Sequence, residues 1–269
     1  MIVIGERINA SNKTVGEAIA KRDSAFIASL ALAQTESGAD FIDVNAGNGQ
    51  YEGTQGEASM KWLVETVQTA TDKPLAIDSD RPEIIEAALQ TYRGEEMFIN
   101  SVTAEPAKLA AIGPLAAEHR AQLVALSMGT DGIPDNAEQR LEACEMIVTH
   151  LTRMGVKIEQ IFFDPLVLPI AVDSKQGMVT LKTLEGIKSR YPGAGTVAGL
   201  SNISYGLPSR KVVNRAFLLM AIYAGLDAAI LDPLDNKMMS LVRVADMLTG
   251  KDVSCRTYIR THRRGMIVD

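Results

Sequence analysis

The amino-acid sequence predicts an α/β protein, a single (β/α)8 TIM barrel. The chain has 269 residues, close to the ~250 residues typical of one such barrel. Short apolar runs alternate with helix-like segments, a pattern that favours parallel strands joined by crossover helices. Carboxylates and amides follow many of these runs directly. In a barrel they would lie at the carboxyl ends of the strands, which is where active sites form.

Eight apolar runs are the predicted strands. They span residues 2–4, 41–44, 75–77, 97–99, 123–126, 161–163, 196–200 and 228–231. Eight strand–helix units favour closure into a barrel, whereas an open, doubly wound sheet is the alternative that the same alternation allows.

Helix signals lie between the runs. Ser24 is a suitable N-cap for a helix that ends near Gly38, since glycine readily adopts the left-handed conformation of a helix end. Residues 135–138 have the form of a capping box and lead into a second amphipathic helix. The final helix is predicted over about residues 236–248.

The organisation is predicted to be one domain over residues 1–269. No Pro/Ser-rich linker or change of composition divides the chain. From about residue 251 onward we expect a C-terminal strap or tail.

The net charge of -6, from 27 Lys+Arg against 33 Asp+Glu, argues against nucleic acid as a partner. A small molecule or a protein is the expected partner. The longest apolar stretch, residues 216–226, is much shorter than the ~20 residues that cross a bilayer. A strand-like run follows Met1 with no basic segment before it, so we expect a cytoplasmic protein that makes no membrane contact.

Metal and phosphate signals are weak. Cys144 and Cys255 lack metal-type spacing, and none of the three histidines lies in an HxH or HExxH pattern, so no bound metal is predicted. The glycines of residues 47–53 resemble a dinucleotide fingerprint, but the third comes one residue too late.

Two aspartates are the leading ligand candidates. Asp78 and Asp164 follow the third and sixth apolar runs, and each carboxylate could accept two adjacent N–H donors from the edge of a heterocycle. Each also has a structural interpretation. Asp78 could cap the helix that starts at Pro82, and Asp164 could open a turn with Pro165.

Amides follow other runs. Asn100 follows the fourth and Ser201-Asn202 the seventh, and amides can both donate to and accept from a ring nitrogen. Asx-turns are the alternative explanation. Asn9 and Asn45, which follow the first and second runs, are further candidate ligands.

Charged residues near the first two runs are ambiguous. Glu6 and Arg7 could form an ion pair at the barrel rim or a catalytic group, and the structural interpretation is slightly favoured. Asp43 lies at the end of the second run.

Six motifs in order resemble the pterin-binding methyltransferases, above all the methyltetrahydrofolate:corrinoid protein methyltransferases of anaerobic bacteria. The motifs are GERIN, DVN, IDS, FINS, FDPL and GLSN, at residues 5–9, 43–45, 77–79, 98–101, 163–166 and 199–202. The resemblance implies a pterin-binding barrel that holds a folate in its mouth. There it exchanges the N5 methyl group of methyltetrahydrofolate with the cobalt of a corrinoid (cobalamin).

The resemblance also implies residue roles. Residues matching Asp78, Asn100 and Asp164 bind the pterin edge, the amide matching Asn202 contacts N5, and the arginine matching Arg210 lies nearby. Because methyl transfer needs positive charge to develop at N5, an amide that can match either protonation state suits the position of Asn202. We therefore expect Asn202, Asp78 and Asp164 to be catalytic, with Ser201 beside them.

The corrinoid is expected on a partner protein, because the Asp-x-His-x-x-Gly corrinoid motif is absent from the sequence. The resemblance further suggests a homodimer. The sequence departs from the family at Tyr205, where relatives tend to carry glutamine.

Two other functions stay open. A dihydropteroate synthase-like enzyme would need cationic groups for a diphosphate leaving group, and its Ser-x-Arg-His ending is absent. A non-catalytic folate-binding or corrinoid-docking subunit is the second alternative.

Overall fold

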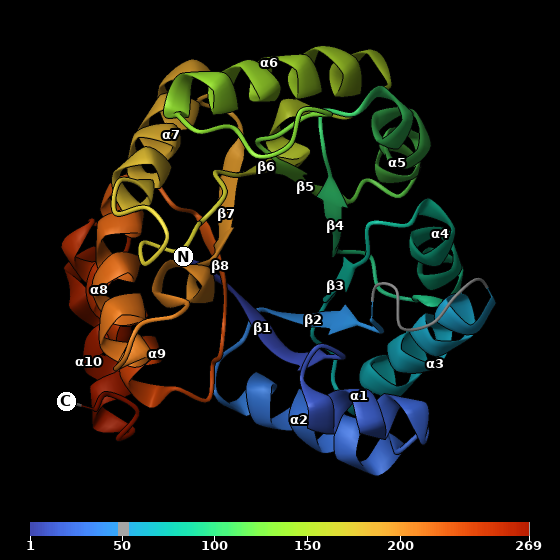
Figure 1. Ribbon diagram of the computed structural model, residues 1–269. Coiled ribbons are helices and arrows are strands. Elements are labelled where there is room, and N and C mark those ends of the chain that lie inside the picture. The colour runs from blue at the N-terminus through green and yellow to red at the C-terminus, as the bar shows by residue number, and fades with distance from the viewer. Residues whose placement is uncertain (48–53, 269) are drawn as a thin grey trace.

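The computed structural model describes residues 1–47 and 54–268. Its eight parallel strands form a closed barrel in chain order (Figure 1), as predicted. The strands are β1 (Ile2–Asn9), β2 (Phe41–Asn45), β3 (Leu75–Asp78), β4 (Met97–Val102), β5 (Gln122–Leu126), β6 (Ile161–Asp164), β7 (Gly195–Gly199) and β8 (Ala228–Leu231). All eight apolar runs are confirmed as strands. Most of the glycine-containing segment 47–53 lies outside the described residues.

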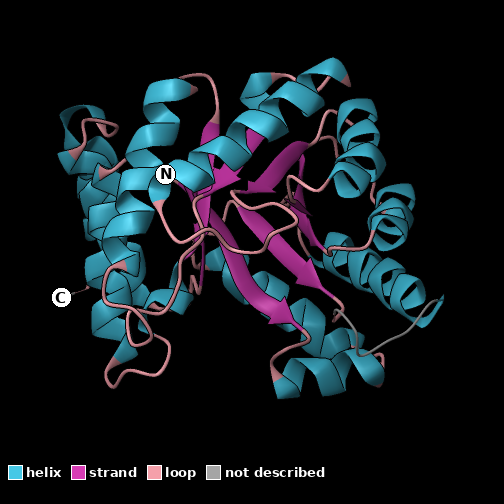
Figure 2. Ribbon diagram, turned by 45° about the horizontal axis from the view of Figure 1, so that its top comes forward, coloured by secondary structure: helices cyan, strands magenta, loops and turns pink. Residues whose placement is uncertain are grey.

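Helices surround the barrel on its outside (Figures 1 and 2). They are α1 (Lys13–Ala20), α2 (Ser24–Glu36), α3 (Thr54–Ala70), α4 (Pro82–Thr91), α5 (Pro106–Glu118), α6 (Ala137–Arg153), α7 (Gln176–Arg190), α8 (Arg210–Tyr223), α9 (Asn236–Leu248) and α10 (Arg256–Arg263). Within residues 1–47 and 54–268, no helix combines the length and the apolar character that a bilayer span requires.

Two predicted helix starts are wrong by one residue. Asp23, not Ser24, caps α2, because its Oδ1 accepts from the Phe26 N–H at 3.0 Å. Asn136, the second residue of the predicted capping box, caps α6 by accepting from the Gln139 N–H at 3.0 Å. In both places two neighbouring residues are good caps. Sequence spacing alone cannot choose between them.

An apolar layer fills the barrel interior below the mouth. Each strand contributes one buried side chain to it: Ile4, Phe41, Ala76, Phe98, Val124, Phe162, Val197 and Ala228. The Phe98 ring packs edge-on against Phe41 and Phe162, at centroid distances of 4.8 and 4.9 Å, a favourable geometry for aromatic pairs. This layer closes the interior, so space for a ligand is left at the strand ends above it.

The segment after α9 is partly helical. A short 3-10 helix (Val253–Cys255) precedes α10, which packs against α9. At the other terminus, the Met1 amino group bonds Asp246 of α9 at 2.8 Å. The amino terminus and α10 thus both contact α9.

Candidate active site at the barrel mouth

The polar mouth follows from the two-residue period of a strand. Side chains two residues apart point to the same face, so the residue two positions after each member of the apolar layer also points inward, one level higher. On five strands that residue is polar: Glu6, Asp43, Asp78, Asn100 and Asp164. The barrel therefore places four carboxyl groups and one amide in a single ring.

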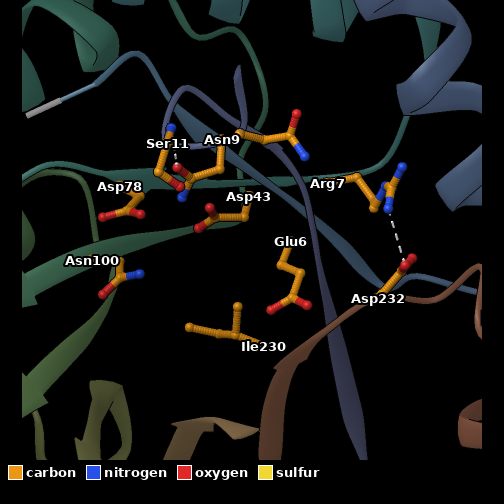
Figure 3. Close-up of a pocket in the computed structure, with 10 residues that line it drawn as sticks. Glu6, Arg7, Asn9, Ser11, Asp43, Asp78, Asn100, Ile230 and Asp232 are labelled. Carbon is orange, nitrogen blue, oxygen red and sulfur yellow. Dashed lines mark hydrogen bonds and ion pairs between the residues drawn. The ribbon is translucent and has the colours of Figure 1, made fainter. Parts of the chain in front are cut away.

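A cavity of about 280 Å³ opens at one side of this ring (Figure 3). It is lined by Glu6, Arg7, Asn9, Ser11, Asn12, Asp43, Asp78, Asn100, Ile230 and Asp232. Most of these side chains come from β1–β4 and the segment after β1. The lining is mainly polar, which suits a ligand that carries several donors and acceptors.

Asp78 and Asn100 form a paired binding edge. They are directly opposite each other in the β3–β4 register, and Asn45 donates to Asp78 Oδ2 at 2.7 Å. Burial raises the pKa of Asp78 to about 6, although the Asn45 hydrogen bond opposes that rise. The predicted alternative role is wrong, because Arg81, not Asp78, is the N-cap residue of α4.

Asp43 lies deeper than the other mouth carboxyls. It is 1% exposed, and its Oδ1 has no hydrogen-bond partner among the described residues. Burial, followed by the charges of Asp78 and Glu6, raises its pKa well above the ordinary value, while the Asn100 side chain acts in the opposite direction. Asp43 therefore holds a proton to higher pH than an ordinary carboxyl group.

Strand β1 becomes irregular at Glu6. The β1–β2 register shifts between Gly5 and Ile8, and such bulges redirect side chains next to active sites. The rim ion pair expected of Glu6 and Arg7 is wrong, because Arg7 Nη1 pairs with Asp232 Oδ2 at 3.3 Å. Burial and then the charge of Asp232 raise the pKa of Glu6 to about 7.

Asp164 forms the turn predicted as its structural role. Its Oδ1 accepts from the Leu166 N–H at 2.8 Å, which forms the expected turn, and Leu166 has a left-handed backbone with φ of 65°. Burial raises the pKa of Asp164 to about 6. Its role as a ligand stays a prediction, since Asp164 is not among the residues that line the cavity.

Arg140 of α6 holds the turn after β6. It is fully buried and donates from Nη1 to the carbonyls of Pro165 and Leu166, both at 2.7 Å. Its Nη2 also donates to Gln176 Oε1 at 2.9 Å. Because these bonds fix the backbone beside Asp164, Arg140 sets the direction of that carboxyl group.

The segment after β7 forms an exposed rim. Ser201 and Asn202 lie on a 3-10 helix (Leu200–Ser204), and Asn202 is exposed. Arg210 donates to the Ser201 carbonyl at 2.6 Å and to Ser204 Oγ at 3.1 Å, and its guanidinium lies 5.9 Å from the centroid of the Tyr205 ring. Ser201 Oγ reaches Glu6 Oε1 at 3.4 Å, so this rim touches the cavity wall.

The predicted site residues thus fall into two groups. Asn9, Asp78 and Asn100 line the cavity and Asn45 bonds to Asp78, whereas Asp164, Ser201, Asn202 and Arg210 are not among the residues that line it. Asn9 Oδ1 accepts from the Ser11 N–H at 2.9 Å, which is an Asx-turn.

Sequence reasoning undervalued four residues of the mouth: Glu6, Asp43, Arg140 and Asp232. The two-residue spacing after Ile4 and Phe41 is a signal that could have identified Glu6 and Asp43. In the described part of the chain, His, Cys, Asp and Glu form no group of three or more that could hold a metal ion.

Solved structures define the class of fold. Dihydropteroate synthase from Xanthomonas albilineans, in complex with 7,8-dihydropteroate, superposes with a TM-score of 0.64 at 18% identity, covering 94% of this chain and 93% of that one. The Stenotrophomonas maltophilia enzyme gives a TM-score of 0.68 at 17% identity with the same coverage. The protein is a TIM barrel of the type found in pterin enzymes.

Sequence comparison defines the family. The model of the family described as "Pterin binding enzyme" matches residues 5–232, and the chain belongs to this pterin-binding enzyme family. It is 36% identical to "Methylcorrinoid:tetrahydrofolate methyltransferase" of Eubacterium limosum, over 99% of this chain and 98% of that protein. It is also 32% identical to methionine synthase of Mycobacterium tuberculosis over 91% of this chain, but spans only 21% of that larger protein.

Proposed function

We propose that this protein is a methyltransferase that exchanges the N5 methyl group between methyltetrahydrofolate and the cobalt of a corrinoid carried by a partner protein. One observation carries the proposal. Along nearly their full lengths, this chain and a methylcorrinoid:tetrahydrofolate methyltransferase are 36% identical. The acid and amide ring at the mouth supplies chemistry that suits a pterin.

The pterin ring is held by Asp78, Asn100 and Asp164 in this proposal. A pterin presents adjacent N–H donors on its pyrimidine edge, and an ionised carboxylate accepts two such donors in a strong, directional pair. Asp78 and Asn100 face each other in register, so the two can bind neighbouring ring atoms. Asn45 keeps Asp78 in place at 2.7 Å, and Asn9 contributes to the same wall.

Asn202 is the proposed contact to N5. Methyl transfer to cobalt leaves electron density on N5, and the reverse reaction consumes its lone pair, so the hydrogen bond needed at N5 differs between the two states. An amide can turn either its oxygen or its NH₂ toward the ring. Ser201 and Arg210 support this segment through the bond to the Ser201 carbonyl.

The corrinoid approaches from the open side of the mouth. Because the cofactor is large and arrives on another protein, the residue that faces it must be accessible, and Asn202 is exposed. We further propose a single-domain, cytoplasmic homodimer that operates in anaerobic one-carbon metabolism. The same site serves either direction of transfer.

The experiment is an anaerobic assay with methyltetrahydrofolate and cob(I)alamin, followed by the cobalt absorption spectrum. We expect enzyme-dependent conversion of Co(I) to methyl-Co(III), and the reverse reaction when methylcobalamin and tetrahydrofolate are supplied. The Asp78→Ala protein serves as the control for reaction without a bound pterin.

A negative result with free cobalamin is followed by the same assay with a purified corrinoid protein. Folate binding without transfer in both assays would support a non-catalytic folate-binding subunit instead. Condensation of a pterin diphosphate with 4-aminobenzoate would support a dihydropteroate synthase-like reaction.

A further inference from the structure

Glu6 differs from the other carboxyl groups of the mouth in its exposure and its hydrogen bonding. Glu6 faces the cavity (Figure 3), and among the described residues its carboxylate accepts one side-chain hydrogen bond, from Ser201 at 3.4 Å. We propose that Glu6 is a catalytic residue that takes up the N5 proton during methylation of tetrahydrofolate and returns it in the reverse reaction. This inference rests on the proposed methyltransferase function.

The reaction requires a proton carrier. When the N5 lone pair of tetrahydrofolate attacks the methyl carbon, the cobalt–carbon bond breaks and both of its electrons stay with cobalt, which becomes Co(I). The product nitrogen would keep both its proton and the methyl group as a cation unless a base removes the proton. A carboxylate can accept this proton during methylation, and the resulting carboxylic acid can return the proton to N5 in the reverse reaction.

The backbone of β1 brings Glu6 into the cavity. The register shift between Gly5 and Ile8 places Glu6 and Arg7 in a bulge. Gln34 of α2, which is fully buried, stabilises this bulge because its Oε1 accepts from the Arg7 N–H at 3.0 Å. A methyl group on Gly5 would lie 2.5 Å from the same Gln34 oxygen, so a larger residue there would displace this hydrogen bond.

The other carboxyl groups of the ring are either bonded to a fixed partner or almost fully buried. Asp78 is bonded to Asn45 at 2.7 Å and Asp164 to the Leu166 N–H at 2.8 Å. Asp43 lines the cavity but has only 1% of its surface exposed. Glu6 is partly exposed, so it can exchange a proton with both a bound ligand and water.

Burial and then the neighbouring charge of Asp232 raise the pKa of Glu6 to about 7. The Ser201 hydrogen bond, Arg7 and Arg210 act in the opposite direction. Arg7 is engaged by Asp232 at 3.3 Å and Arg210 by the Ser201 carbonyl. Efficient proton transfer needs a group that can gain and lose a proton near the working pH, and this arrangement provides one.

The test compares Glu6→Gln with the control Glu65→Gln, an exposed position on the outer helix α3. We expect Glu6→Gln to lower kcat about 100-fold or more in both directions, with the Kd for tetrahydrofolate changed less than about threefold. Glu6→Asp, which keeps a carboxyl group, should recover part of the loss. The control should behave as the wild type.

The pH dependence gives a second readout. In wild-type protein, kcat/KM for tetrahydrofolate methylation should rise as Glu6 ionises, around pH 7, and demethylation of methyltetrahydrofolate should fall over the same range. Asp232→Asn removes a charge that raises the pKa of Glu6. In this variant the rise of kcat/KM with pH should therefore occur at lower pH.

Three results would overturn the role of Glu6. They are a kcat within about threefold of wild type for Glu6→Gln, equal losses in kcat and folate affinity, and a wild-type rate that does not change between pH 5.5 and 8.5. The last needs no variant and applies even if Glu6→Gln fails to fold. A wild-type protein that binds folate but transfers no methyl group with free or protein-bound corrinoid would instead contradict the proposed function itself.

Discussion

The two sides of the barrel mouth are built in different ways. On the β1–β4 side, polar groups are buried and bonded to one another, with Asn45 fixed to Asp78 and Asp43 almost without exposure. On the β7–α8 side, Asn202 is exposed, and so is Tyr205, with 65% of its surface accessible. The first side is therefore organised before a ligand arrives, while the second is open to a large partner. We infer that ring binding belongs to the first side and methyl transfer to the second.

The largest effect on binding is expected from the organised side. Asp78→Ala removes a carboxylate that would accept two N–H donors of the pterin edge, each charged hydrogen bond contributing ~1.5 kcal/mol or more. We expect the Kd for tetrahydrofolate to rise about 100-fold, measured by isothermal titration calorimetry. Asp72→Ala, an exposed aspartate shortly before β3, is the control. Unchanged affinity in Asp78→Ala would remove the distinction between the two sides.

Asn202→Ala tests the open side. Because its amide would contact N5 mainly as charge changes there, we expect kcat to fall about 30-fold, equivalent to ~2 kcal/mol. The Kd for tetrahydrofolate should change less than about threefold. Stopped-flow absorption of cobalt gives the rate. Equal losses in kcat and affinity would mean that Asn202 binds the ring as Asp78 does.

The sequence predicts the strands and the candidate ligands at their ends, but it does not by itself identify every residue of the mouth. All eight strands were identifiable, because buried parallel strands are short, continuous apolar runs bounded by polar residues. Asp78, Asn100 and Asp164 followed from their place at the strand ends. The apolar layer at Ile4 and Phe41 was equally visible, yet it becomes informative about Glu6 and Asp43 only once the inward face of each strand is known.

Other features depend on contacts between distant segments. The bulge at Glu6 and Arg7 is stabilised by Gln34, which lies 27 residues after Arg7 and whose Oε1 accepts from the Arg7 N–H. In the sequence, Arg140 resembles a solvent-exposed arginine on a helix, but it is fully buried against the carbonyls of Pro165 and Leu166. Neither contact leaves a local pattern in the sequence.

Acid should weaken the pterin binding proposed for Asp78 and Asp164. Burial raises the pKa values of Asp78 and Asp164 to about 6, and only their ionised forms accept two N–H donors. Tetrahydrofolate affinity should therefore be constant above about pH 7 and fall as pH drops through 6, by about tenfold per pH unit for each carboxylate that must ionise. Calorimetry from pH 5 to 8 measures this. In Asp78→Asn the fall should be shallower, and an affinity that rises on acidification would contradict the assignment.

The smallest effect is expected at Tyr205 on the open side. The ring is largely exposed and its main neighbour is the Arg210 guanidinium at 5.9 Å, a contact of ~0.5–1 kcal/mol at an exposed site. Arg210 keeps its bonds to the Ser201 carbonyl and Ser204 Oγ without the ring. We therefore expect Tyr205→Ala to change kcat by about threefold or less and Tyr205→Phe to change nothing, in the cobalt assay. A loss as large as that of Asn202→Ala would show that the open side is more tightly organised than its exposure suggests, because the ring would then be needed to hold Arg210 and the segment before it.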